Sequence, residues 1–212
     1  MDSILLDTDS YKVSMWKQYP AGTEYVYSYI ESRGGKYTVT EHLGVQAFAQ
    51  RLARTRITKK MVDDANRIWT AHGEPFNYDG WMYIVNELGG KLPVRIRAAR
   101  EGLIIPTKNV VCTIENTDPK CHGLTTWLET PLLRAVWYPT TVSTQSKYIK
   151  NILQEYLEKS GDPTTIGFKL HDFGARGVSS KESAMLGGMA HLVNFMGNDT
   201  ISGIMGARKY YH

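Results

Sequence analysis

Residues 170–180 read LHDFGARGVSS, and this stretch says most about the fold. Its apolar start ends in two glycines on either side of Arg176, and two serines then begin a helical pattern. Ser179 and Glu182 fit a capping box, in which each side chain bonds a backbone N–H of the first helical turn. We therefore predict a strand, a tight turn and a helix N-terminus, with Phe173 and Arg176 at the turn. Backbone donors and the helix dipole favour anions and polar groups there, and a ring beside a guanidinium suits a flat, polar heteroaromatic ligand.

The chain after the break at Gly161-Asp162-Pro163 alternates two expected strands with two expected helices. We predict them at 168–170, 180–191, 192–195 and 201–211. Two successive strand–helix units indicate a parallel sheet or barrel. Ligands bind such folds at the carboxyl ends of the strands, where Phe173, Arg176 and Asp199 would lie. Since two units cannot close a barrel, we expect the sequence to be the N-terminal part of a longer protein.

The preceding residues predict helices and a small, mainly antiparallel sheet. Aromatic, β-branched and alternating patterns indicate strands at 25–30, 93–98, 103–105 and 110–114. Helical spacing of apolar residues indicates helices at 43–52, 59–69, 81–88, 119–128 and 142–157. Thr58 and Asp118 are expected to cap two of these helices. Pro131 is expected to kink or end a helix.

Composition and charge exclude several classes of protein. The chain is 42% hydrophobic and 22% charged, as ordinary globular proteins are. Its net charge of +4 is spread along the chain, which does not indicate nucleic-acid binding. Cys112 and Cys121 match no metal-ligand spacing, so we expect buried free thiols and a reducing compartment. The N-terminus lacks a signal-peptide pattern and no apolar stretch could span a bilayer. We therefore expect a cytoplasmic protein without a membrane partner.

A series of short motifs, in order along the whole chain, resembles those of the nicotinamide phosphoribosyltransferases. They are Thr8-Asp9-Ser10-Tyr11-Lys12, Lys17-Gln18-Tyr19-Pro20, Glu115-Asn116-Thr117-Asp118-Pro119, Trp137-Tyr138-Pro139-Thr140-Thr141, His171-Asp172-Phe173-Gly174, Arg176-Gly177-Val178-Ser179-Ser180 and Gly197-Asn198-Asp199-Thr200. The loop after Arg33 is shorter than in animal members of the family. The resemblance is therefore to the bacterial or phage type, and to its N-terminal portion.

The resemblance implies an activity and an assembly. Phosphoribose would pass from phosphoribosyl pyrophosphate to nicotinamide, giving nicotinamide mononucleotide and pyrophosphate in NAD salvage. Pyrophosphate would leave ribose C1 and the pyridine nitrogen would attack an oxocarbenium-like centre, so that catalysis is mostly positioning and electrostatics. The family also implies a homodimer with shared active sites, Mg²⁺ bound with phosphoribosyl pyrophosphate, and ATP as an activator of full-length members.

The implied fold is α/β with an α+β N-terminal part. An antiparallel β-rich domain would be joined to the first βα units of an irregular α/β barrel, as in type II phosphoribosyltransferases. We divide the chain into residues 1–140, the β-rich and helical part, and residues 141–212, the start of the barrel with the base-binding motifs.

The resemblance also implies roles for individual residues. Phe173 would stack on the pyridine ring, with Tyr11 of the other subunit on its second face. Arg176 would bond the carboxamide oxygen and lend positive charge to nearby phosphate oxygens. Asp199 would accept from the carboxamide N–H₂ and repel the carboxylate of nicotinate. Arg33 would reach phosphate in the neighbouring subunit's site. No catalytic residue and no metal ligand is assigned in this chain.

Other interpretations stay open beside this one. Without the motifs, Phe173 is more typical of a core residue, Arg176 of a surface ion pair and Asp199 of a helix cap. Structural roles are favoured for His171 and His191. The runner-up activity is that of a nicotinate phosphoribosyltransferase. A further alternative is a truncated, non-catalytic module that dimerises with or completes a second chain, because the family's activating histidine, ribose-binding acid and phosphate clamp would lie outside these residues.

Overall fold

The computed structural model describes residues 3–211, which form two compact units. Within these residues, unit 1 consists of 3–30, 48–98 and 112–134. Unit 2 consists of 31–47, 99–111 and 135–211. Each unit is therefore built from segments that are far apart in the sequence.

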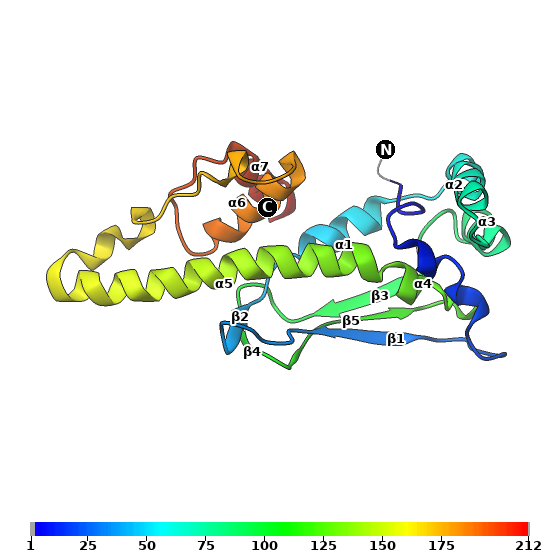
Figure 1. Ribbon diagram of the computed structural model, residues 1–212, viewed down its shortest axis with the longest axis horizontal. Helices are drawn as coiled ribbons and strands as arrows, with labels where there is room; N and C mark the ends of the chain where they lie inside the picture. Colours follow the sequence, from blue (N-terminus) through cyan, green and yellow to red (C-terminus); the bar gives the residue numbers. More distant parts are fainter. Residues whose placement is uncertain (1–2, 212) are drawn as a thin grey trace. The chain divides into compact units, whose positions relative to one another are not determined.

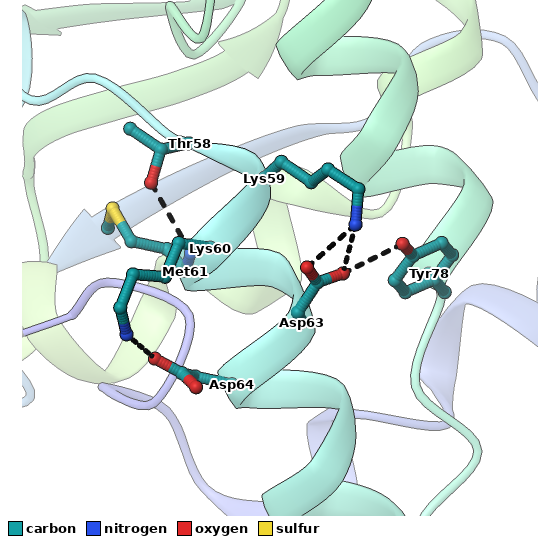
Figure 2. Close-up of polar contacts among 7 residues, drawn as sticks. All are labelled: Thr58, Lys59, Lys60, Met61, Asp63, Asp64 and Tyr78. Atoms are coloured by element: carbon teal, nitrogen blue, oxygen red, sulfur yellow. Dashed lines mark hydrogen bonds and ion pairs between the residues drawn. The ribbon is translucent and has the colours of Figure 1, made fainter.

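Helix α2 (Lys59–His72) of unit 1 begins where the sequence predicted a cap. The Thr58 hydroxyl accepts a hydrogen bond from the backbone N–H of Met61 (Figure 2). Lys59 pairs with Asp63, which also accepts from the hydroxyl of Tyr78, the first residue of α3 (Tyr78–Glu87). Exposed pairs at this spacing contribute only about 0.3–0.5 kcal/mol each. The cap therefore fixes the start of the helix more than the ion pairs do.

An aromatic cluster forms the core of unit 1. Its members, which come from α2, α3, α4 (Leu124–Trp127) and the α2–α3 loop, are Trp69, Phe76, Trp81 and Trp127. The indole N–H groups of Trp69 and Trp127 donate to the carbonyls of Leu5 and Ile4, each at 2.9 Å. Indole rings need such a partner when they are buried. The N-terminal segment that leads to Tyr11 is thereby fixed to the core of unit 1.

The main sheet has the strand order β1 (Tyr27–Glu31), β5 (Val110–Asn116), β3 (Val94–Ala98) (Figure 1). The predicted antiparallel pairing is confirmed for β3 and β5, with Ile96 opposite Ile114. The expectation that β4 (Ile104–Pro106) lies in this sheet is wrong. Because β5 already has a neighbour on each edge, β4 pairs instead with β2 (Val39–Glu41), a strand that the sequence did not predict.

The helix expected at 119–128 is a 3₁₀ helix, Pro119–Cys121, followed by α4, and the helix expected at 142–157 is part of the longer α5 (Glu129–Ser160). Pro131 lies in the first turn, where a backbone N–H has no acceptor within the helix, so the predicted break is wrong. Pro139 lies inside α5 and cannot donate to the Ala135 carbonyl. That carbonyl faces Gly44, where a Cβ would lie 2.0 Å from its oxygen. The proposed division after residue 140 lies within α5 and stays a prediction.

The expected strands at 168–170 and 192–195 are wrong. Residues Pro163–Phe168 form a 3₁₀ helix, and the second segment is the end of α6 (Lys181–Leu192) with the turn after it. A single parallel bridge between Asp172 and Asn198 takes the place of a parallel ladder. Phe195 of the second run is buried in a turn and Phe168 of the first run is exposed, so a short apolar run does not by itself distinguish a strand from a turn.

Helix α1 (Val45–Arg54) begins in unit 2 and runs on into unit 1 from Phe48, and α7 (Ile201–Tyr210) is the last helix of unit 2. Helix α6 is capped one residue later than predicted, because the hydroxyl that accepts the Ser183 N–H belongs to Ser180 and not to Ser179. Helices α6 and α7 lie against each other through Gly188 and Gly203 (Figure 1); a Cβ on Gly203 would lie 2.6 Å from the Gly188 Cα. Within residues 3–211, no helix is both long and apolar enough to span a membrane.

Candidate functional site

Two loops of unit 2 are joined by backbone hydrogen bonds. The Asp172 N–H donates to the Gly197 carbonyl at 3.2 Å, and the Asp199 N–H donates to the Asp172 carbonyl at 3.0 Å. In this parallel bridge Asp172 is opposite Asn198. Residues on either side of a bridged pair point to the other face of the strand pair. The bridge therefore brings Phe173 and Asp199 to the same edge, although neither residue follows the strand that the sequence predicted.

His171 lies between these two side chains. Its Nδ1 is 3.2 Å from Oδ2 of Asp199, and its ring is nearly parallel to that of Phe173, with centroids 6.2 Å apart at 21°. Gly197 makes this arrangement sterically feasible, because a Cβ there would lie 2.6 Å from the imidazole ring. The face is open: Phe173 is 57% exposed, and the side chains of Asp199 and His171 are 53% and 42% exposed.

A buried histidine, His191, bonds backbone carbonyls of both loops. Nε2 of His191 is 3.2 Å from the Leu170 carbonyl and 2.9 Å from the Gly197 carbonyl. Carbonyls only accept, so Nε2 carries a proton and donates to them, and Nδ1 lies 3.3 Å from the Ser146 hydroxyl. His191 is 4% exposed, which agrees with the structural role favoured for it. It is a positioning residue for the two loops.

Asp172 and Asn198 orient the turns, and sequence reasoning missed both. Oδ1 of Asp172 accepts from the Gly174 N–H at 2.8 Å, and Oδ1 of Asn198 accepts from the Thr200 N–H at 2.8 Å. The amide of Asn198 also donates to the Gly188 carbonyl of α6 at 2.9 Å. An Asp or Asn two residues before the accepted N–H is the usual pattern of an Asx turn, so the signal was present in the sequence.

Arg176 ends the short 3₁₀ helix Gly174–Arg176, three residues after Phe173. Its side chain is exposed and makes no hydrogen bond or ion pair with any residue between 3 and 211. Arg33 lies in an exposed loop of unit 2 between β1 and β2. The structure does not bring Arg33 into contact with the side chains around His171.

Tyr11 belongs to unit 1, in the 3₁₀ helix Ser10–Lys12, and is 59% exposed. The adjacent Lys12 is buried and bonds Glu129, with its Nζ 4.8 Å from the centre of the Tyr11 ring. Burial opposes the charge on Lys12, but the hydrogen bonds to Glu129 and Tyr11 and the charge of Glu129 outweigh it and raise the Lys12 pKa. Lys12 therefore stays charged and holds the backbone next to Tyr11.

The sequence matches two families at its two ends. Residues 3–96 match the family described as nicotinamide phosphoribosyltransferase, N-terminal domain, and residues 168–211 match the nicotinate phosphoribosyltransferase (NAPRTase) family. The chain is 52% identical over 214 residues to the nicotinamide phosphoribosyltransferase of Xanthomonas campestris pv. campestris, covering 100% of this chain and 46% of that protein. The chain belongs to the nicotinamide phosphoribosyltransferase family. It corresponds to the N-terminal portion of the family's members.

More distant relatives agree with this assignment. The nicotinamide phosphoribosyltransferase of Mycoplasma genitalium is 30% identical over 223 residues, covering 94% of this chain and 49% of that protein. That of Acinetobacter baylyi is 29% identical over 221 residues, covering 96% and 44%. The chain spans about half the length of the curated relatives it matches.

A solved structure shares the fold of this nicotinamide phosphoribosyltransferase family member. The crystal structure of human nicotinic acid phosphoribosyltransferase superposes with a TM-score of 0.62 at 18% sequence identity, covering 96% of this chain and 37% of that one. The mixture of helices and antiparallel strands, together with this likeness, confirms the predicted fold class.

Proposed function

We propose that the protein to which this chain belongs transfers phosphoribose from phosphoribosyl pyrophosphate to nicotinamide, giving nicotinamide mononucleotide and pyrophosphate in NAD salvage. The parallel bridge that brings Phe173 and Asp199 to one exposed edge carries this proposal. Phe173 offers a face for stacking, and the Asp199 carboxylate is an acceptor for an amide N–H. Nicotinamide has a flat, electron-poor ring and a carboxamide, which match both groups.

Asp199 also supplies the proposed selectivity between amide and acid. Nicotinate would place its carboxylate against the Asp199 carboxylate, whereas nicotinamide donates an N–H to it. Specific sites commonly reject a near-identical ligand through such a repulsive contact. We propose that Arg176 bonds the carboxamide oxygen, and its exposed guanidinium, which has no bonded partner among residues 3–211, supports this role.

The proposed enzyme is a cytoplasmic homodimer with shared sites. Tyr11 and Arg33 are both exposed, and we propose that each serves the site of the partner subunit, Tyr11 by stacking and Arg33 by binding phosphate. A second chain that carries the C-terminal half is the alternative source of the missing groups. Cys112 and Cys121 are buried free thiols, which fits a reducing compartment.

In the proposed reaction, this part of the chain orients the base. Stacking on Phe173 and the bond to Asp199 would fix the pyridine nitrogen relative to ribose C1 as pyrophosphate leaves. Among the described residues, no group of three or more His, Cys, Asp or Glu side chains could hold a metal ion. We therefore propose that Mg²⁺ arrives with phosphoribosyl pyrophosphate as part of the substrate, and that ATP acts, where it does, on the full-length enzyme.

The test compares two substrates in the full-length protein that contains this chain. Nucleotide formation from nicotinamide and from nicotinate is measured with phosphoribosyl pyrophosphate in the wild type and in Asp199→Ala. We expect the nicotinamide-to-nicotinate ratio of kcat/KM to fall by about ten- to a hundredfold, the size of one lost charged hydrogen bond. Asp79→Asn, which removes an exposed charge in α3, is the matched control. An unchanged ratio in Asp199→Ala contradicts the assigned role.

A nicotinate phosphoribosyltransferase is the second candidate, because the match to that family covers residues 168–211, the part with the candidate site. A wild type that uses nicotinate in preference to nicotinamide supports this candidate. A non-catalytic module is the third. If the 212-residue chain forms nucleotide by itself, the phosphate-binding machinery is not missing and that alternative is rejected.

A further inference from the structure

The His171–Asp199 pair has a defined proton arrangement. Asp199 as a carboxylate only accepts, so the Nδ1 of His171 donates across their 3.2 Å separation. Nε2 of His171 has no bonded partner within residues 3–211, and the side chain is 42% exposed. Nε2 can therefore exchange a proton with water while Nδ1 stays bonded to Asp199. The pair carries one negative charge when His171 is neutral and no net charge when His171 is an imidazolium.

We propose that His171 is a specificity-determining residue: it positions the Asp199 carboxylate, and its charge sets how strongly the site prefers nicotinamide to nicotinate. This inference rests on the proposed function, in which Asp199 meets the carboxamide. With neutral His171, Asp199 presents a full negative charge that repels nicotinate. With protonated His171, the pair is neutral overall and the acid is admitted more readily. The preference for the amide therefore falls as the pH falls.

The charged and titratable groups around His171 lie on two segments of the chain. The residues packed against its ring from the other segments are Phe168 and Gly197, which do not titrate, and Asp199. The charged residues closest along its own segment are Lys169, Asp172 and Arg176. Of these, Asp172 accepts from the Gly174 N–H.

The experiment measures competition between nicotinamide and nicotinate in the full-length protein at a fixed concentration of phosphoribosyl pyrophosphate. The ratio of the two mononucleotide products is followed from about pH 8.5 to about pH 5.5. Titration of the phosphates affects both reactions equally and cancels in this ratio. For one unit charge several ångströms from the substrate carboxylate at a partly exposed site, we expect the ratio to fall on the order of tenfold in the wild type.

Two variants separate the hydrogen bond from the charge. His171→Asn puts an amide N–H near the position of Nδ1 but cannot titrate, so it should keep the high-pH ratio and lose the pH dependence. His171→Phe keeps a ring against Phe173 without a donor, so it should have a higher KM for nicotinamide and a flat profile. His72→Asn changes an exposed histidine at the end of α2 and should match the wild type.

The outcomes distinguish this inference from the proposed function. A wild-type ratio that is constant with pH, or a His171→Asn variant that keeps the wild-type pH dependence, overturns the role of His171 and leaves the proposed function standing. A wild type that forms no nicotinamide mononucleotide at any pH overturns both. If His171→Asn does not fold, the wild-type profile and His171→Phe still decide the question.

Discussion

Gly197→Ala tests whether the packing of one glycine against His171 is needed for base binding. The added Cβ would lie 2.6 Å from the Cδ2 atom of the imidazole ring and 2.7 Å from Nε2. Carbon atoms in contact are normally about 3.5 Å apart or more, so the ring must move by roughly 1 Å. Moved away from Asp199, Nδ1 would be about 4 Å from the carboxylate, beyond hydrogen-bond distance.

The loss should appear in substrate binding more than in stability. A typical hydrogen bond contributes about 0.5–1.5 kcal/mol, so KM for nicotinamide should rise about three- to tenfold. The His171 side chain is exposed enough to rotate, so the melting temperature should change by only a few degrees. Steady-state kinetics and thermal unfolding of the full-length protein measure the two effects.

Gly177→Ala is the matched control for this prediction. Its Cβ would lie 3.6 Å from the Gly174 carbonyl, an ordinary contact, and its φ of −99° suits any residue. Both substitutions add one methyl group to the same pair of loops, but only the first displaces His171. If Gly197→Ala has the same KM for nicotinamide as Gly177→Ala, the reasoning about the imidazole position is wrong.

Three further predictions concern the chain itself. Thr58→Ala should lower the free energy of unfolding by about 1 kcal/mol in urea titration, because α2 loses its cap, whereas Thr70→Ala on the same helix should not. Burial raises the pKa of Cys112 to about 11, and burial with the nearby Asp118 charge raises that of Cys121 to about 12, so iodoacetamide at neutral pH should label both thiols only after unfolding. Burial lowers the pKa of His42 below 6.5, against the opposing charge of Glu101. The unfolded chain therefore binds the proton first, and stability should fall below about pH 6.5 by at most about 1.4 kcal/mol per pH unit, a slope that His42→Gln should remove.

Local signals in the sequence predicted local structure well. The caps at Thr58 and Asp118 are confirmed, because a side-chain oxygen that bonds an N–H two or three residues later needs no distant partner. The effect of Pro131 was predicted wrongly, because a proline breaks a helix only when it lies beyond the first turn. Pro131 lies in the first turn of α5. The pairing of β4 with β2 could not be predicted, because the choice of partner depends on which strand edges the rest of the chain has already occupied.

The candidate site was predictable in its residue types and only partly in its geometry. The motifs identified Phe173 and Asp199, and the bridge shows them on one edge. The contact of His171 with Asp199 joins residues 28 positions apart through two turns, and no periodicity in the sequence reports such a pair. The roles of Tyr11 and Arg33 depend on a partner subunit and stay predictions.

The two loops that carry the site are held together largely by bonds within one continuous segment of the chain. Every bond that holds them in register lies between residues 167 and 200: the bridge at Asp172, the His191 imidazole on both loop carbonyls, and the Gly167 carbonyl that accepts from Met196 and Gly197. The exceptions are the Ser146 hydroxyl on α5 and the Asn194 amide, in the turn after α6, which donates to Glu41 and to the Ser143 carbonyl. A protein engineer could therefore transplant this segment into another scaffold as one continuous piece, provided that the recipient supplies partners for the His191 imidazole and the Asn194 amide and a surface for the face of α6 that packs on α7.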